Sequence, residues 1–303
     1  MQKIKLPKGF KIGHSQNKHT GVTVVLAPDK TVGGVSVRGS APGTRETDLL
    51  KSEKAVQEIN AIALCGGSAF GLDACSGVVK YLAEQHIGFS VGDVKVPLVA
   101  GAVIFDLNQE VIKSNSYPNS DMGYVACKNA TANQDKWGSV GAGTGATVGK
   151  IMGAPFSQKG GIGAATIESG DIFLTAITVC NAVGDVIDYT TGNIVAGLND
   201  TAGNFLNTSN VIVAGAASGM TKADIGANTT LTCLITNAKI DKLHANKLAD
   251  IAHNGYAKSI NPVHTDYDGD TIFCLSNGDK EFNFTALSVM AVEAVCKSIL
   301  NCF

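Results

Sequence analysis

The step Asn228-Thr229-Thr230 opens a run of strand-forming residues at 231–235. Threonine suits a strand and asparagine suits a turn, so this step has a purely structural explanation. It also has a chemical one, because the Thr229 hydroxyl can attack the preceding carbonyl and form an ester that water hydrolyses. Such a reaction would cut the chain between Asn228 and Thr229 and leave Thr229 as a new N-terminus. The bond is therefore a candidate cleavage site.

A free N-terminal threonine would carry both groups that an amide hydrolase needs. A hydroxyl is a weak nucleophile until a base takes its proton, and the α-amine of the same residue can be that base. The pKa of an α-amine is roughly 7.7–8.0, so a useful fraction is unprotonated near neutral pH. Thr229 is thus the candidate nucleophile, provided that the bond before it is cut.

A pair of carboxylates, Asp268 and Asp270, precedes a predicted strand at 271–278. At positions i and i+2 of an extended chain they would share a face, where they could orient and balance a nearby ammonium. An EF-hand calcium loop is excluded, because the glycine and glutamate of such a loop do not occur at the required positions. A simple Asp-Gly turn remains the structural alternative.

Other catalytic and binding motifs do not fit. The glycine-rich segment 138–153 is not a phosphate loop, because Thr144 stands where the first glycine of that motif belongs. We interpret it as a loop that runs close to other backbone and holds Lys150 in place. No G-x-S-x-G or HExxH motif occurs, and we interpret His253 and His264 as packed or capping residues instead of metal ligands. No metal or organic cofactor is predicted.

The composition indicates a well-buried protein without a polyanionic partner. Of the 303 residues, 45% are apolar and only 17% are charged, and the net charge is −2. This favours a large core and an oligomer interface, and it argues against nucleic acid or a membrane surface as a partner. We find no signal peptide and no stretch long enough to span a membrane. Eight scattered cysteines without CxxC spacing suit a reducing compartment, so we expect a cytoplasmic protein.

The apolar pattern alternates between strands and helices. Strands are predicted at 21–28, 33–38, 60–64, 96–107 and 271–278, with two more around a turn within 171–188. Helices are predicted at 68–86, 244–260 and 284–300. This order favours a layered α+β architecture in which helices cover a pair of sheets, and one domain over residues 1–303.

Six segments carry a resemblance that covers nearly the whole chain. They are GVSVRGSAPGTRETDLL (34–50), LCGGSAFGLDACSGV (64–78), VPLVAGAVIFDL (96–107), GAGTGATVGK (141–150), ANTTLTCLITNAKI (227–240) and NPVHTDYDGDTIF (261–273). In order and spacing they resemble the DmpA-type aminopeptidases, a family that also includes the nylon-oligomer hydrolases. Each segment alone is a weak signal, whereas the combination is specific.

The resemblance implies a fold and a maturation step. The fold would be a four-layer αββα sandwich, similar to that of N-terminal-nucleophile hydrolases but differently connected. The precursor would cut itself into a large subunit, 1–228, and a small subunit, 229–303, which stay together and assemble into homo-oligomers. By position, Thr229 matches the nucleophile of the family and Asn181 its oxyanion-hole asparagine, which would donate to the developing oxyanion.

The resemblance also separates two branches of the family. Lys150 matches the lysine of the nylon-oligomer hydrolases, and Asp268 and Asp270 match their acidic pair. Together with a threonine nucleophile, this places the chain nearer to that branch than to the aminopeptidase branch. A substrate-binding tyrosine of the family has two candidates here, Tyr117 and Tyr124, and the sequence does not choose between them.

The expected activity is hydrolysis of a short peptide or another small amide with a free amino end. Two alternatives stay open. In acyl transfer, as in the ornithine acetyltransferases, an amine instead of water would take the acyl group from Thr229. A metabolite-binding protein that keeps the fold without processing is the other alternative.

Overall fold

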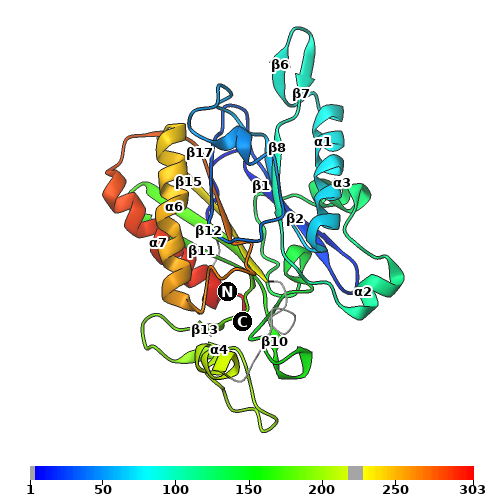
Figure 1. The fold of residues 1–303 in the computed structure, drawn as a ribbon. Coiled ribbons are helices and arrows are strands. Elements are labelled where there is room, and N and C mark those ends of the chain that lie inside the picture. The colour runs from blue at the N-terminus through cyan, green and yellow to red at the C-terminus, as the bar shows by residue number, and fades with distance from the viewer. Residues whose placement is uncertain (1–3, 218–227) are drawn as a thin grey trace.

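Two five-stranded sheets packed face to face form the centre of the molecule (Figure 1). A computed structural model describes residues 4–217 and 228–303. The first sheet has the strand order β1 (Lys11–Gln16), β2 (Gly21–Leu26), β5 (Ala61–Cys65), β8 (Val99–Val103), β4 (Thr44–Arg45). The second has the order β11 (Gly161–Ser169), β12 (Ile172–Asn181), β15 (Thr229–Ala238), β17 (Thr271–Lys280), β3 (Val32–Val37).

The space between the sheets is filled by apolar side chains from both of them. Strand β5 has the sequence AIALC and is buried along its whole length, as expected of a strand that is covered on both faces. From the first sheet Ile62 and Leu64 enter the same cluster as Leu231 and Phe273 of the second. This cluster fixes the two sheets against each other, and with them the strand ends that carry the candidate site.

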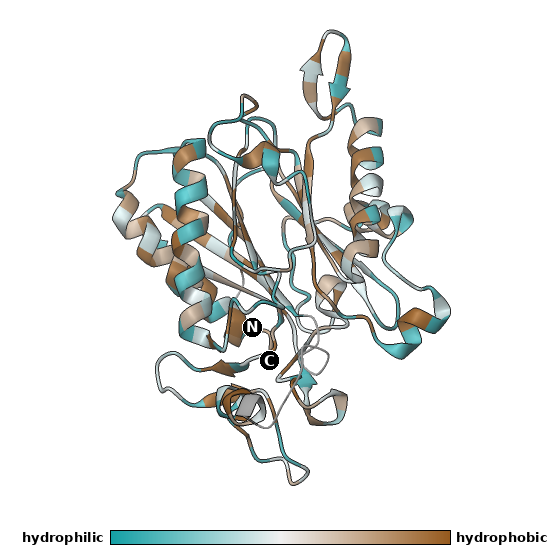
Figure 2. Ribbon diagram, in the orientation of Figure 1, coloured by the Kyte–Doolittle hydropathy of each residue, from teal (hydrophilic) through white to brown (hydrophobic). Residues whose placement is uncertain are grey.

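Helices cover the outer face of each sheet. α1 (Ala74–Glu84) and α3 (Ser120–Lys128) pack on the first sheet, and α6 (Lys242–Ser259) and α7 (Phe284–Leu300) on the second. Figure 2 shows hydrophilic and hydrophobic residues mixed along these helices, which suits helices with one face on a sheet and one in solvent. The layers therefore run α, β, β, α, and the predicted α+β sandwich is confirmed.

Shorter elements lie around this frame. A three-stranded sheet contains β14 (Ile194–Ala196), β13 (Asp185–Ile187) and β16 (Ile260–Asn261), and two small pairs are β9 (Thr147–Val148) with β10 (Gln158–Lys159) and β6 (Phe89–Val91) with β7 (Val94–Val96). The remaining helices are α2 (Gln109–Ser114) and α4 (Thr208–Ala217), with short 3-10 turns η1 (Asp48–Leu50), η2 (Ser68–Asp73), η3 (Gly141–Gly143) and η4 (Ala154–Phe156).

The structure differs from the local sequence pattern in several places. The predicted strand 96–107 is reduced to β8, Val99–Val103, and α3 was not predicted. The predicted helix 68–86 begins as the 3-10 turn η2, and the α-helix starts only at Ala74. The strands on either side of the turn near Asp29 do not pair with each other, because β2 joins the first sheet and β3 the second. Local periodicity identifies a strand but does not say which sheet it will join.

The ends of three inner strands meet at one end of the second sheet. β12 runs antiparallel to β15, and its last residue, Asn181, stands opposite Thr229, the first residue of β15. β17 runs parallel to β15 with its first pair at Leu231 and Thr271. The end of β12 and the beginnings of β15 and β17 therefore converge, and the predicted site residues lie there.

Candidate active site

The bond between Asn228 and Thr229 is held on both sides by the segment before β17. The backbone N–H of Asn228 donates to the carbonyl of Tyr267 (3.0 Å), and the Asn228 carbonyl accepts from the N–H of Gly269 (3.2 Å). Both Asn228 and Thr229 are buried, with exposed fractions of 1% and 4%. Gly226 and Ala227, which precede the predicted cleavage step, lie outside the described residues. The bond is thus fixed inside the protein instead of in an open surface loop.

The Thr229 hydroxyl lies against the carbonyl that it would attack. It donates to the Asn228 carbonyl oxygen, and it accepts a hydrogen bond from the Gly269 N–H at 3.1 Å. One N–H group of Gly269 therefore points at both the hydroxyl and the carbonyl oxygen. If Thr229 Oγ1 added to that carbonyl carbon, the negative charge would develop on an oxygen that already has a backbone donor.

Asn181 and Lys150 form a second group opposite Thr229. The Lys150 ammonium nitrogen donates to the backbone oxygen of Asn181 (3.1 Å) and to its side-chain oxygen (2.9 Å). The side-chain amide of Asn181 donates to the carbonyl of Phe105 (3.0 Å). A primary amide has two N–H groups, so one remains to donate to an oxyanion.

The two aspartates occupy different positions around Thr229. Asp268 accepts from the backbone N–H (2.7 Å) and hydroxyl (2.6 Å) of Thr265. Asp270 accepts from the backbone N–H of Thr230 (2.7 Å), so it is fixed to the residue that follows Thr229. Both precede β17 instead of lying within it, and both are almost fully buried.

Burial shifts the pKa values of two of these groups toward neutrality. Loss of water lowers the pKa of Lys150 from 10.5 to about 7, although the charges of Asp268 and Asp106 oppose the shift. Burial, together with the charge of Asp270, raises the pKa of Asp268 to about 6, against the hydrogen bonds from Thr265. Both groups therefore exchange protons close to physiological pH, which is typical of catalytic groups.

Three contributors to this site could not be assigned from sequence. Asp106 follows β8, is 6% exposed, and accepts from the Thr20 hydroxyl (2.7 Å) and the Gly67 N–H (2.6 Å). Burial raises the pKa of the Asp106 carboxyl, and the charge of Asp106 raises the pKa of Lys150. Gly269 contributes only a backbone N–H, and His264 contacts Asp270. The one sequence signal was that Asp106 stands near the end of the apolar run VPLVAGAVIFDL.

The two tyrosine candidates lie differently. Tyr124, on α3, donates its hydroxyl to Glu84 (2.7 Å) on the outside of the first sheet. Tyr117 stacks on the exposed ring of Phe70, with ring centroids 4.2 Å apart. Neither is hydrogen-bonded to the site residues through any contact that the structure describes. The assignment of a substrate tyrosine therefore stays open.

Residues outside this site show little further chemistry. In the described ranges no group of three or more His, Cys, Asp or Glu side chains is arranged to hold a metal ion. All eight cysteines are buried free thiols, as predicted. Among the helices of the described segments, none is both long and apolar enough to cross a membrane.

Comparison with known proteins gives matches over almost the whole chain. The model of peptidase family S58 matches residues 7–303. A Mycobacterium tuberculosis protein named as an uncharacterized aminopeptidase is 39% identical over 288 residues, which are 89% of this chain and 80% of the relative. The 6-aminohexanoate-oligomer endohydrolase of a Kocuria species is 28% identical over 308 residues, 97% of this chain and 83% of the relative.

A solved structure agrees with the layered fold. The L-aminopeptidase D-Ala-esterase/amidase of Ochrobactrum anthropi, described as a variant of the Ntn-hydrolase fold, superposes with a TM-score of 0.69 at 15% identity. The match covers 100% of this chain and 87% of that structure. At this identity the likeness concerns the fold, and it confirms the predicted N-terminal-nucleophile-hydrolase-like sandwich.

Proposed function

The chain belongs to peptidase family S58, and on that basis we propose that it cuts itself before Thr229 and then uses Thr229 as the nucleophile of an amide hydrolase. Membership makes it a hydrolase of peptide or linear amide bonds, with aminopeptidase-like relatives. The observation that carries the proposal is the contact between the Thr229 hydroxyl and the Asn228 carbonyl, with the Gly269 N–H directed at both.

Self-cleavage would begin with attack of Thr229 Oγ1 on the Asn228 carbonyl carbon. The hydroxyl proton needs an acceptor, and before cleavage the α-nitrogen of Thr229 is an amide without basic character. Lys150 supports this step, because its lowered pKa leaves much of it neutral near pH 7. A neutral amine can donate two hydrogens to Asn181 and still keep a lone pair for a proton. As the adduct collapses, Lys150 would return the proton to the Thr229 nitrogen, the C–N bond would break and the acyl group would stay on Oγ1. Water would then hydrolyse this ester and free Thr229.

After cleavage the same groups suit turnover of an external amide. The new α-amine would take the proton from Oγ1 and deliver it to the leaving amine. Asn181 and the Gly269 N–H would stabilise the oxyanion, an effect worth about 3 kcal/mol for one donor in comparable sites. Asp268 and Asp270 would balance and orient the nearby cationic amines. Water would release the acyl group, and no cofactor takes part in this scheme.

The substrate class follows from the relatives and from the charges of the site. Among the relatives, the names aminopeptidase and 6-aminohexanoate-oligomer endohydrolase both describe hydrolysis of a linear amide. We expect small substrates with a free amino end, such as a short peptide or a β-amino amide. We also expect a homo-oligomer of processed subunits located in the cytoplasm, with neither nucleic acid nor membrane as a partner.

Intact mass under denaturing conditions tests the proposal directly. Wild-type protein should give two fragments, residues 1–228 and 229–303, whereas Thr229→Ala should remain whole. Thr230→Ala is the matched control, because the Thr230 hydroxyl has no hydrogen-bond partner among the described residues. That variant should be cut, because its backbone N–H to Asp270 is kept. The processed protein is then assayed with amino-acid p-nitroanilides and with a linear 6-aminohexanoate dimer.

Either of two results would contradict the proposal. If wild-type protein stays whole under conditions in which it hydrolyses these amides, Thr229 has no free amine and cannot be the nucleophile. If Thr229→Ala is cut as fast as wild type, the cleavage is not driven by this hydroxyl. A competing amino acid such as ornithine separates hydrolysis from acyl transfer, because a hydrolase should release mainly the free acid and a transferase should give mainly the amine adduct.

A further inference from the structure

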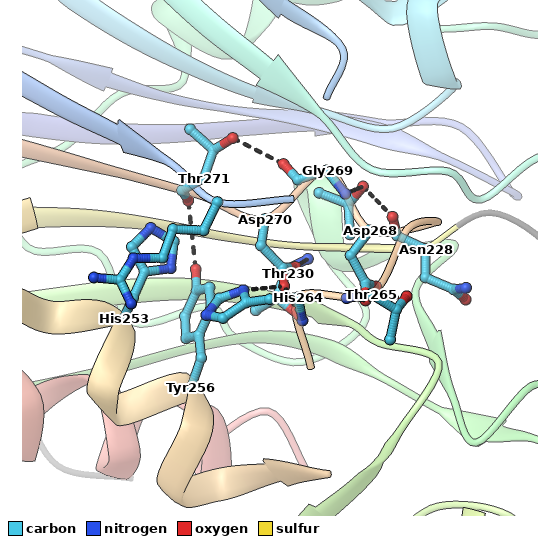
Figure 3. Close-up of polar contacts among 12 residues, drawn as sticks. Asn228, Thr230, His253, Tyr256, His264, Thr265, Asp268, Gly269, Asp270 and Thr271 are labelled. Atoms are coloured by element: carbon cyan, nitrogen blue, oxygen red, sulfur yellow. Dashed lines mark hydrogen bonds and ion pairs between the residues drawn. The ribbon is translucent and has the colours of Figure 1, made fainter. Parts of the chain in front are cut away.

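His264 lies beside the active site and has no role in the scheme above. It belongs to the segment between β16 and β17, and its ring nitrogen Nδ1 lies 2.8 Å from Oδ2 of Asp270. The backbone N–H of His264 donates to the same oxygen at 3.1 Å. A carboxylate oxygen only accepts, so Nδ1 carries the hydrogen of this contact. One residue therefore supplies two donors to one oxygen of Asp270 (Figure 3).

The backbone of His264 is in an uncommon conformation that permits this double contact. Its φ is +57°, in the left-handed region that residues other than glycine seldom adopt. Such a conformation costs free energy and persists only where its surroundings enforce it, which occurs often at functional sites. Here the turn brings the backbone N–H and the imidazole of His264 to the same side, so that both reach Asp270.

Asp270 transmits this contact to Thr229. Its second oxygen, Oδ1, accepts from the backbone N–H of Thr230, where β15 has not yet begun to pair with β17. The residue before Asp270 is Gly269, whose N–H points at the Thr229 hydroxyl. The orientation of the Asp270 carboxylate therefore sets the position of both the nucleophile and one oxyanion donor.

The imidazole is itself held by packing against α6. Its ring centroid lies 4.8 Å from that of His253, at an interplanar angle of 67°, and 5.9 Å from that of Tyr256. The other ring nitrogen of His264, Nε2, is buried without a hydrogen-bond partner among the described residues. The ring thus makes one polar contact in the described part of the chain, and that contact is with Asp270.

We propose that His264 is a positioning residue for the reaction at Thr229, acting through the Nδ1–H that orients Asp270. This inference rests on the proposed function, and it extends it to a residue that does not touch the reacting atoms. Small displacements of reacting groups can lower a rate by about 100-fold, even when the binding site for the substrate is intact. Loss of the Nδ1 donor should accordingly reduce kcat and the rate of self-cleavage, with little change in KM.

Three substitutions at this position separate the donor from the fold. Asn, Asp and Gly all tolerate the left-handed backbone well, and the backbone N–H to Asp270 is retained in each. Only His264→Asn keeps a side-chain N–H near the position of Nδ1, whereas His264→Asp has nearly the same shape but presents to Asp270 a carboxylate that repels it. His264→Gly removes the ring altogether. His14→Ala is the control, because His14 is a buried histidine that contacts Thr23 through Nδ1 (2.9 Å) in the other sheet.

Self-cleavage and kcat should fall roughly 10- to 100-fold in His264→Gly and His264→Asp, and His264→Asn should recover most of the loss. The control should lose thermal stability but keep both rates. Wild-type rates in His264→Gly or His264→Asp would overturn the inference, as would equal losses in His264→Asn and His264→Asp. If His264→Gly does not fold, the inference is tested by the self-cleavage rates and kcat values of His264→Asn and His264→Asp. Wild-type protein that neither cleaves nor hydrolyses amides would instead overturn the proposed function itself.

Discussion

Replacing Gly269 by alanine should slow self-cleavage by roughly 10²- to 10³-fold in a chain that still folds. A Cβ added at this position would lie 2.8 Å from Thr229 Oγ1, 2.9 Å from the carbonyl oxygen of Ala41 and 3.1 Å from Cα of Pro42. Contacts of Cβ atoms below 3.0 Å essentially do not occur, so the Thr229 hydroxyl, the Ala41 carbonyl or the residue at 269 itself must shift. The φ of Gly269 is not positive, so alanine adds no strain to its own φ angle, and the effect comes from the close contacts of its Cβ.

The expected size of the effect follows from the two contacts of the Gly269 N–H. This group lies 3.1 Å from the Thr229 hydroxyl oxygen and 3.2 Å from the Asn228 carbonyl oxygen. The added methyl group must push the Thr229 hydroxyl away, or separate residues 267–271 from residues 41–42. Loss of one oxyanion donor costs about 3 kcal/mol, or roughly 10²- to 10³-fold in rate. The overpacking itself should lower the free energy of unfolding by about 1–3 kcal/mol.

The assay measures the rate of self-cleavage in newly synthesised protein. Protein from cell-free synthesis is sampled over time, and the fragments 1–228 and 229–303 are quantified by intact mass. Gly101→Ala is the matched control, because its Cβ would meet Cys75 Sγ at 2.6 Å where α1 packs on the first sheet. That variant should lose stability and cleave normally. Cleavage of Gly269→Ala at the wild-type rate would refute the role given to this N–H.

Three further outcomes are expected. Self-cleavage should accelerate as pH rises through about 7, because Lys150 then loses its proton, and Lys150→Met should slow it at least ~100-fold across the pH profile. Asp268→Asn should move the midpoint of that profile to lower pH, since the Asp268 charge raises the pKa of Lys150; a midpoint that moves upward would contradict this. Burial lowers the pKa of His14 and of His253 from 6.5 to about 4, so the unfolded chain binds more protons between these values. The free energy of unfolding should therefore fall as pH drops from about 6.5 to 4, by roughly 3 kcal/mol for each histidine, and His253→Gln should make the fall shallower in urea titrations.

Local patterns were sufficient for the elements with strong periodicity, but they did not predict β1 or α3 and did not give the pairing of the strands. The helices at 244–260 and 284–300 and the strand at 271–278 were predicted nearly to their ends, because their apolar periodicity is contained within each segment. The separation of β2 and β3 into different sheets could not be predicted in this way. It depends on contacts between residues far apart in sequence, which a local pattern does not encode.

The same distinction applies to the candidate site. Thr229 could be singled out from its neighbours, because its chemistry depends on the adjacent peptide bond. Asn181 and Lys150 were identified only by resemblance, since their relation to Thr229 depends on the register of β12 with β15. The backbone N–H of Gly269 carries no side-chain signal. His264 was interpreted as a packed or capping residue. Its contact with Asp270 depends on a left-handed backbone conformation that the sequence pattern does not indicate.

Under the proposed self-cleavage, the electrostatics of the site give the partly buried Lys150 a specific role. An uncut chain has no α-amine at Thr229, so the first reaction needs a base that the fold supplies. A lysine in water is protonated at pH 7, and only the removal of water brings the pKa of Lys150 down to about 7. Asp268, with its pKa raised to about 6, limits that shift without reversing it. In the proposed scheme the packing around Lys150 would therefore do more than position it, because a neutral lysine at pH 7, and with it self-cleavage, would depend on the folded state.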